Sequence, residues 1–129
     1  EVVYYKDSLL NADASSFEYL GCHYGKDRNT AFQGKDPIEG SHSRSFEIVD
    51  WQWQKDKFRY YFKGEAMKDI DYSTFEILDL SYSKDKNRVY YRMKIVEEAA
   101  LQNFKINRMN GIGTDGVNKF KHGKIYNNQ

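Results

Sequence analysis

A repeat of 29 residues constrains this chain more than any other feature. Phenylalanine recurs at a constant spacing of 29 residues: Phe17, Phe46, Phe75 and Phe104. Aspartate recurs at spacings of 29, 29 and 30 residues: Asp27, Asp56, Asp85 and Asp115. Each aspartate has an aromatic or apolar residue three positions before it and an aromatic residue five positions after it. A period of this size predicts a repeat protein in which each unit buries its apolar face against its neighbours.

The clearest copy of the repeat, residues 81–91, has the pattern of a β-hairpin. Its polar turn, residues 85–88, is flanked by the aromatic and β-branched residues that favour strands. We therefore expect a mainly β fold, an antiparallel meander of about four stacked hairpins with one-turn helices in the links. Gly34, Gly64 and Gly123 close the hairpins, where a positive φ is expected.

The length of 129 residues predicts a single repeat domain. Its units are expected at about 1–21 (partial), 22–50, 51–79, 80–107 and 108–129 (degenerate). Residues 1–5 match the second strand of the hairpin without its first strand. This match predicts that the chain starts inside a unit of a longer parent, of which an exported precursor would be one version.

The links between units carry helix-forming features. Asp13 and Asp71 each precede the repeated phenylalanine by four residues and are expected to cap a single helical turn. His42 and Ala100 hold the same place in the other two units, where capping is expected to be weaker or made differently. Residues 95–102 contain good helix formers and are expected to extend the fourth link into a short helix.

Alternation along the strands predicts which side chains face the core. We expect Trp51 and Trp53 to point inward, and Gln52 and Gln54 to point outward. The residues five positions after each aspartate are expected to form the continuous core: Phe32, Tyr61, Tyr90 and Phe120. The aromatic residues of opposite parity are candidates for an exposed partner-binding face: Tyr60, Phe62 and Tyr91.

The charge balance excludes binding that depends on a strong overall field. Lys plus Arg is 20 and Asp plus Glu is 19, which gives a net charge of +1. Aromatic residues make up 16% of the chain, so the core must be built largely from rings. No apolar run is long enough to span a bilayer. The single cysteine, Cys22, excludes an internal disulfide framework.

Motifs that could carry chemistry are weak. Residues 111–116 match G-x-G-x-x-G, but a strand-like segment follows where a dinucleotide site needs a helix. Cys22 and His23 are neighbours in a strand and should point to opposite faces, so a packed cysteine is favoured over a catalytic pair. The three histidines fall at different repeat phases, without the close spacing of a zinc site. We therefore assign no catalytic, cofactor-binding or metal-binding residue.

Basic residues recur around each turn aspartate and are expected to form one edge of the repeat. These residues are Lys26, Arg28, Lys55, Lys57, Lys84, Lys86 and Arg88. Each cluster contains an aspartate, and lysine at exposed edges also protects sheets from aggregation. A solvated edge is therefore favoured over a site for nucleic acid or another polyanion.

The segments Lys26-Asp27-Arg28-Asn29, Lys55-Asp56-Lys57 and above all residues 84–91, joined to an Asp-x-x-x-Phe link, resemble the DKNYY repeat family of bacterial proteins. The resemblance covers nearly the whole chain. It implies a bacterial source, an exported setting in the periplasm or cell envelope, and a repeat made of hairpins. The family has no established activity, so the resemblance implies no catalytic residues. Phe58 in place of the turn asparagine, and residues 114–116, depart from the motif.

Three classes of function follow from these observations. We expect a non-enzymatic module that binds a protein partner at the cell envelope, of which an inhibitor or immunity protein would be one case. A glycan-binding module is the alternative, and exposure of Trp51 or Trp53 would favour it. An enzyme is the third class, which a pocket with convergent carboxylates or histidines would favour. The open ends of a repeat also allow self-association through strand edges.

Overall fold

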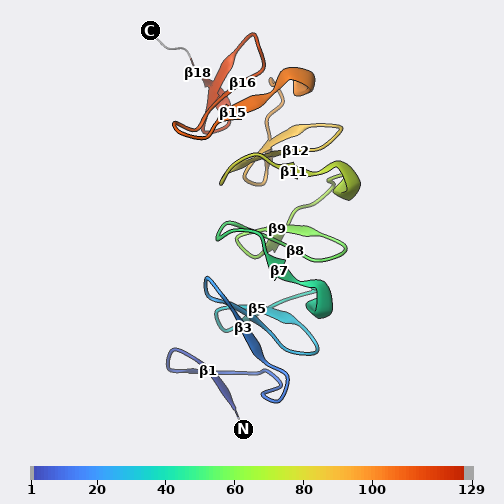
Figure 1. Cartoon of the computed structure of the whole chain (residues 1–129), viewed down its shortest axis with the longest axis vertical. Helices are drawn as coiled ribbons and strands as arrows, with labels where there is room; N and C mark the ends of the chain where they lie inside the picture. Colours follow the sequence, from blue (N-terminus) through green and yellow to red (C-terminus); the bar gives the residue numbers. More distant parts are fainter. Residues whose placement is uncertain (1, 127–129) are drawn as a thin grey trace. The chain divides into compact units, whose positions relative to one another are not determined.

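The structure, a computed structural model, describes residues 2–126 and is mainly β, as predicted. Antiparallel sheets follow one another along the chain, and the links contain single turns of 3-10 helix (Figure 1). The chain divides into two compact units, the first ending at Met67 and the second beginning at Lys68. Each unit is described separately.

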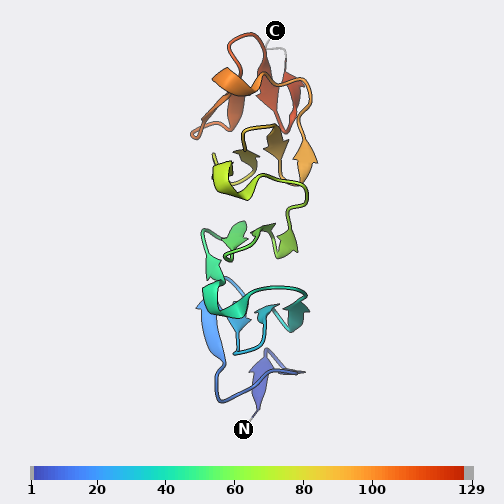
Figure 2. The ribbon, with the colours of Figure 1, turned by 90° about the vertical axis from the view of Figure 1, so that its right-hand side faces the viewer.

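The first unit contains three sheets (Figure 2). The first sheet pairs β1 (Val3–Tyr5) with β2 (Ser8–Leu10). The second sheet comprises β3 (Glu18–Gly21), β4 (Tyr24–Lys26), β5 (Ala31–Gln33) and β6 (Asp36–Ile38). The third sheet follows the 3-10 turn η1 (Ser43–Ser45) and comprises β7 (Glu47–Ile48), β8 (Trp53–Lys55), β9 (Tyr60–Phe62) and β10 (Glu65–Ala66).

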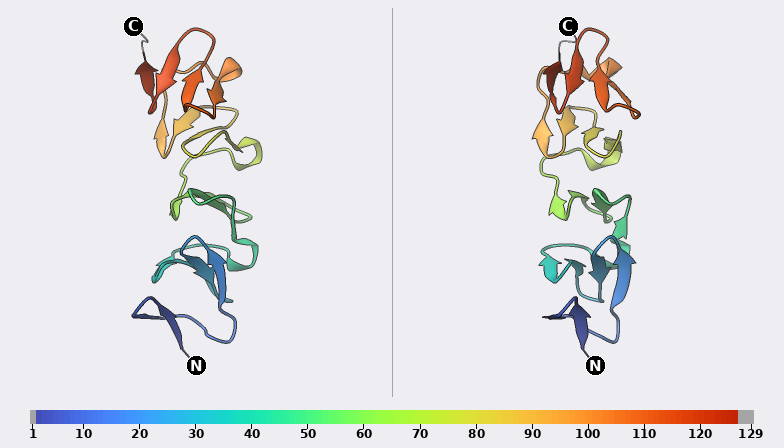
Figure 3. Two further views of the ribbon diagram at one scale, coloured as in Figure 1. Left: turned by 60° about the vertical axis from the view of Figure 1, so that its left-hand side comes forward. Right: turned by 90° about the vertical axis from the view of Figure 1, so that its left-hand side faces the viewer.

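The second unit contains two four-stranded sheets (Figure 3). One follows η2 (Tyr72–Thr74) and comprises β11 (Glu76–Ile77), β12 (Tyr82–Lys84), β13 (Val89–Tyr91) and β14 (Lys94–Ile95). The other follows η3 (Leu101–Asn103) and comprises β15 (Lys105–Asn107), β16 (Ile112–Thr114), β17 (Lys119–Lys121) and β18 (Lys124–Tyr126).

Each four-stranded sheet is a meander whose strands pair in chain order. The hairpin predicted from residues 81–91 is the central pair, β12 and β13, of the sheet formed by β11 to β14. Three turns connect the four strands. The entry turn joins the first two strands: residues 22–23, 49–52, 78–81 and 108–111. The Asp turn joins the central pair: residues 27–30, 56–59, 85–88 and 115–118. The exit turn joins the last two strands: residues 34–35, 63–64, 92–93 and 122–123.

The core of each unit lies between neighbouring sheets. In the first unit, Phe46 packs against Tyr24 of the second sheet, with ring centroids 6.3 Å apart, and against Tyr61 of the third, at 5.5 Å. In the second unit, Phe104 packs in the same way against Tyr82 and Phe120. The four residues predicted to form the core column are all buried: Phe32, Tyr61, Tyr90 and Phe120. The repeated phenylalanine therefore links one sheet to the next.

The prediction from strand alternation is wrong for two residues. Trp53 is fully buried as expected, but Trp51 is 69% exposed because it lies in the entry turn and not in a strand. Gln54, expected to point outward, is fully buried. Alternation fails at Gln54 because both faces of this sheet are packed: the side chains of the neighbouring strand β9 are buried on one face at Tyr61 and on the other at Phe62.

The links also differ from prediction. The Asp71 side chain caps no backbone N–H and instead accepts a hydrogen bond from the Thr74 hydroxyl. His42, where capping was expected to be weaker or made differently, accepts the Ser45 N–H through its ring nitrogen Nδ1 at 3.3 Å. Asp13 likewise accepts bonds from the hydroxyls of Ser15 and Ser16. The short helix expected over residues 95–102 is absent from this described segment, where β14 is followed by a turn and η3. The chain stays extended there because Val96 is buried and donates its N–H to the Val89 carbonyl.

Candidate functional site

The aspartate of each repeat is buried and ties its own sheet to the preceding link. Asp85 Oδ1 accepts the backbone N–H groups of Asn87 at 2.8 Å and Arg88 at 3.0 Å, within the Asp turn. Its Oδ2 accepts the N–H of Asp71 at 2.8 Å and the hydroxyl of Tyr90 at 2.9 Å. The carboxylate thus joins the turn, the start of the 3-10 link and a core tyrosine. We call this arrangement the aspartate bridge.

The backbone bonds of the bridge occur in all four repeats, and the tyrosine bond occurs at Asp56 and Asp85. Asp27, Asp56 and Asp115 make the same bonds to the two N–H groups of their own turns. They also bond the N–H groups of Asp13, His42 and Ala100 in the preceding links. A hydroxyl in the link supports three of the turns by accepting the N–H of the residue after the aspartate: Ser16, Ser45 and Thr74. The motif aspartate is therefore a structural acceptor.

The bridge shifts the ionisation of both partners. Burial alone would raise the pKa of Asp56 and of Asp85, but the hydrogen bonds donated to each carboxylate outweigh burial and lower the pKa. Burial and the bond to the carboxylate raise the pKa of Tyr61 and of Tyr90 to about 12. At neutral pH the carboxylate is ionised and the tyrosine is protonated. This is the pair of states that the hydrogen bond requires.

The histidines and the cysteine do not form a common site within the described residues. His23 bonds the Tyr5 hydroxyl at 2.6 Å, and His122 bonds the Tyr91 hydroxyl at 3.3 Å. Cys22, expected to be packed, is exposed because it lies with a left-handed φ of 54° in the entry turn. Across residues 2–126, no group of three or more His, Cys, Asp and Glu side chains is placed to hold a metal ion.

The basic edge is partly occupied by internal bonds. Lys26 donates to the carbonyls of Arg44 at 3.3 Å and Phe46 at 3.2 Å. Arg28 forms an ion pair with Asp13 at 2.6 Å. These basic residues line a cavity of about 290 Å³, which also receives Glu18 and the buried Asp27. The lining therefore mixes both signs of charge.

The three residues predicted to bind a partner are not equally accessible. Phe62 is only 5% exposed and packs edge-on against Trp53, so the expectation that it faces outward is wrong. Tyr60 is half-buried, with the Lys55 ammonium 6.0 Å from its ring centroid. Tyr91 is half-buried and packs against Tyr82. Of the three residues, Tyr60 and Tyr91 are therefore partly accessible and Phe62 is not.

Two entry turns each present an exposed apolar side chain, which strand alternation does not reveal. Trp51 occupies the entry turn of the third sheet, and Leu80 holds the equivalent exposed position in the second unit. Asp50 Oδ1 fixes the first of these turns by accepting the N–H groups of Gln52 and Trp53, both at 2.8 Å. Asp79 makes the equivalent bonds in the second unit. The 29-residue spacing of these two aspartates in the sequence indicates both turns.

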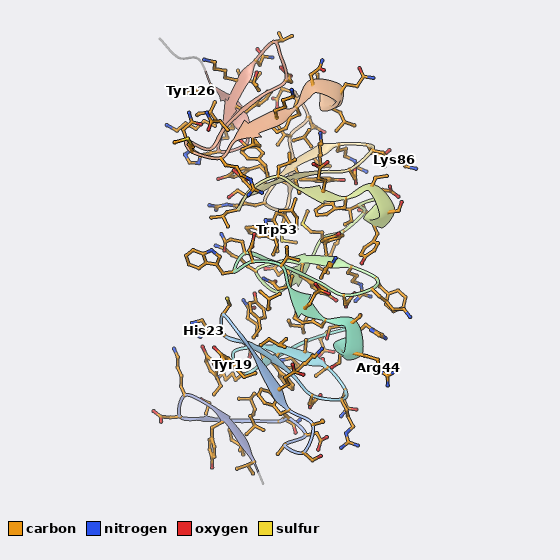
Figure 4. All side chains as sticks on the ribbon, in the orientation of Figure 1. Tyr19, His23, Arg44, Trp53, Lys86 and Tyr126 are labelled. Atoms are coloured by element: carbon orange, nitrogen blue, oxygen red, sulfur yellow. The ribbon has the colours of Figure 1, made fainter. Side chains whose placement is uncertain are left out.

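A second group of exposed rings lies in the first unit. Tyr19, on β3, is 65% exposed, and its hydroxyl accepts the backbone N–H of His23 at 3.4 Å. The His23 ring meets the ring of Tyr5 edge-on, with centroids 5.9 Å apart. Figure 4 shows Tyr19 and His23 on one side of this unit, and Arg44 of the basic edge on the other.

Comparison with known proteins identifies one relationship. The model of the DKNYY family matches residues 1–126, which is nearly the whole chain. No curated protein and no solved structure matches the sequence. Among the described residues, no helix has the length and apolar character needed to cross a membrane.

Proposed function

This chain belongs to the DKNYY family, and we propose that it is a non-enzymatic bacterial module that binds a protein partner at the cell envelope. The observation that carries the proposal is Trp51, a large side chain that is 69% exposed on a turn with a fixed backbone. Tryptophan is enriched among the residues that dominate binding energy at protein interfaces.

The entry turn around Trp51 is held before any partner arrives. Besides the two bonds to the Asp50 side chain, the N–H groups of Val49 and Asp50 donate to the Trp53 carbonyl at 2.9 and 3.1 Å. The N–H of Lys63, in the exit turn, donates to the Gln52 carbonyl at 2.7 Å. A side chain presented on a fixed backbone loses little conformational entropy on binding, which favours affinity.

The bonding of the motif aspartates supports the non-enzymatic part of the proposal. Perturbed pKa values are typical of catalytic groups as well as of structural ones. Here the oxygens of Asp56 and Asp85 accept four bonds each from their own repeat. These bonds account for the perturbed pKa values without a reaction. The envelope setting rests on the family resemblance.

Affinity capture with variants of Trp51 tests the proposal. The parent chain and a Trp51→Ala variant are used to capture proteins from envelope and lysate fractions of the source bacterium, at low and moderate salt. Phe58→Ala is the matched control because Phe58 is an exposed aromatic residue at the Asp turn of the same sheet. We expect one protein in near-equal amount with the parent and Phe58→Ala, and its loss with Trp51→Ala. Capture that is unchanged by Trp51→Ala would contradict the proposal.

A glycan ligand is the second candidate, and the same exposed tryptophan favours it because sugars stack on open indole rings. Trp53, which is fully buried, contributes nothing to this alternative. Titration with soluble cell-wall glycan fragments, followed by tryptophan fluorescence, separates the two candidates. A saturable change that disappears in Trp51→Ala, with no protein captured, would establish the glycan instead of the protein partner.

A further inference from the structure

The exit turns of the two units differ in charge. In the first unit an acidic residue follows the turn: Asp36 in the second sheet and Glu65 in the third. In the second unit the corresponding residues are Lys94 and Lys124. Two further basic residues lie beside them: Arg92 in one exit turn, and Lys121 at the end of β17 before the other. The exit turns of the four-stranded sheets therefore carry both signs of charge in the first unit and only basic charged residues in the second.

Cross-strand pairing makes one of these two replacements, the one at Lys124, unfavourable for folding. Asp36 and Glu65 lie opposite uncharged residues, Gln33 and Phe62. Lys124 instead lies directly opposite Lys121. Like charges in directly opposed positions destabilise a β-hairpin. A feature that costs stability in one unit and is avoided in the other indicates a role outside folding.

Tyr91 brings the two basic turns together. Its hydroxyl bonds the His122 ring at 3.3 Å, and a Cβ at Gly123 would lie 2.8 Å from its own Cβ. The Arg92 guanidinium lies 5.2 Å from the Tyr91 ring centroid, and Lys94 is its cross-strand partner. Arg92 and Lys94 of one exit turn and His122 of the other therefore lie around one half-buried ring.

Arg108 extends the same surface. Its Nε donates to the carbonyl of Leu78, in the entry turn of residues 78–81. The Ser81 carbonyl of the same turn accepts the backbone N–H of Arg92. Asp79 belongs to this entry turn, but its Oδ1 already accepts two backbone N–H groups there. Figure 4 labels Tyr126, on the β18 side of the unit, and Lys86, of the Asp turn, on opposite sides.

We propose that this basic surface binds an acidic segment, rich in Asp and Glu, of the protein partner. The surface consists of Arg92, Lys94, Arg108, Lys121, His122 and Lys124. This inference rests on the proposed protein-binding function and adds the chemistry of the partner. Clustered, exposed cations attract an anionic chain and orient it before close contact.

Carboxylates fit this surface better than nucleic acid does. Single strands bind with bases stacked on open aromatic faces. The ring of Tyr91 already contacts Tyr82, Arg92 and His122, and the Lys121 ammonium lies 5.3 Å from the ring centroid of Tyr126. The rings that accompany these cations thus offer little free surface for a base.

Charge reversal at two positions tests the inference on the full chain. Lys94→Glu and Lys124→Glu are combined, since acidic residues stand at these places in the first unit. The matched control combines Lys86→Glu with Lys105→Glu, which makes the same change in net charge on exposed residues. Glu76 holds the place of Lys105 in the preceding repeat. Binding of a labelled peptide of alternating Glu and Ser, and of oligothymidine of equal length, is measured by fluorescence anisotropy at low and moderate salt.

We expect the Lys94/Lys124 variant to weaken binding of the acidic peptide by about tenfold, and the control to weaken it by less than about twofold. Equal losses in the two variants would overturn the inference, because net charge alone would then explain the binding. Tighter binding of oligothymidine than of the peptide, with the same dependence on Lys94 and Lys124, would also overturn it in favour of nucleic acid.

Capture experiments keep this inference distinct from the proposed function. A partner that is lost with Trp51→Ala but retained by the Lys94/Lys124 variant would leave the proposed function intact and refute the acidic-segment site. If the parent captures no protein, the proposed function fails, and the peptide measurement still decides whether the basic surface selects acidic polypeptides.

Discussion

Replacement of Asp56 with asparagine tests the aspartate bridge with almost no change in side-chain size. The carboxylate accepts four hydrogen bonds, two at each oxygen. In the variant, Oδ1 retains the bonds from Phe58 and Arg59. The new amide NH₂ takes the place of Oδ2 and faces the N–H of His42 and the hydroxyl of Tyr61. The tyrosine hydroxyl can rotate to accept a hydrogen bond from the NH₂. The His42 N–H cannot, so two donors, this N–H and the NH₂, face each other without an acceptor.

The expected loss follows from counting these bonds. A hydrogen bond to a charged group contributes roughly 1.5–3 kcal/mol, and a donor left without an acceptor costs roughly 1–3 kcal/mol. With one bond recovered by Tyr61 and one donor left opposed, Asp56→Asn should lower the free energy of unfolding by about 3 kcal/mol. Tyr61→Phe, which copies Phe32 of the preceding repeat, removes one bond to the carboxylate and should lower it by about 1.5 kcal/mol.

Urea unfolding followed by tryptophan fluorescence measures the loss. Trp53 is fully buried in the same sheet as Asp56, and a Trp51→Phe background removes the exposed fluorophore. At an unchanged slope of about 1–3 kcal/mol per molar urea, the midpoint should fall by at least about 1 M. Asp36→Asn, at an exposed aspartate, is the control. A change at Asp56 within about 0.5 kcal/mol of the control would refute the bridge as a source of stability.

Three further predictions follow from other contacts. The folded pKa of Asp56 lies below the unfolded value of about 3.9, so at pH values between these two pKa values the unfolded chain binds more protons than the folded chain. The urea midpoint should therefore fall as the pH is lowered from about 5 through the folded pKa, and it should fall less in Asp56→Asn. Gly113→Ala should cost about 1–3 kcal/mol in thermal or urea unfolding because its Cβ would lie 2.7 Å from the Phe104 ring, whereas Gly111→Ala, with open space but φ of 73°, should cost about 1 kcal/mol. Ser83 is fully buried, and its hydroxyl has no hydrogen-bond partner among the described residues, so Ser83→Ala should leave stability unchanged or raise it by up to about 1 kcal/mol; a clear loss in the same assay would contradict this.

The repeat itself was predictable because period and residue type are visible in the sequence. The 29-residue spacing of phenylalanine and aspartate identified the buried Phe46 and the turn at Asp56, together with the mainly β class. The burial of the aspartate was not predictable in this way. Its acceptor role depends on N–H groups of a link that lies 14 residues earlier in the chain, and backbone donors leave no pattern in the side chains.

The exposed residues were harder to predict than the core. Trp51 and Trp53 have the same parity, but Trp51 is exposed and Trp53 is buried. The difference arises because the entry turn ends, and β8 begins, between these two residues. Phe62 was misplaced for a different reason. Alternation separates inside from outside when one face of a sheet meets solvent, but these sheets are packed on both faces. The basic surface of the second unit depends on contacts through Tyr91, which sequence spacing does not show.

The direction in which the aspartate bridge reaches has a consequence for synthesis of the protein. Each aspartate bonds an N–H group that precedes it by 14 or 15 residues, together with groups at most five residues after it. During translation, every partner of a bridge has therefore left the ribosome shortly after the aspartate itself. Such short loops favour rapid closure, and domains of this kind can fold from the N-terminus as they emerge. Within each unit, a repeat can then offer a finished sheet to the following repeat while that repeat is still being made.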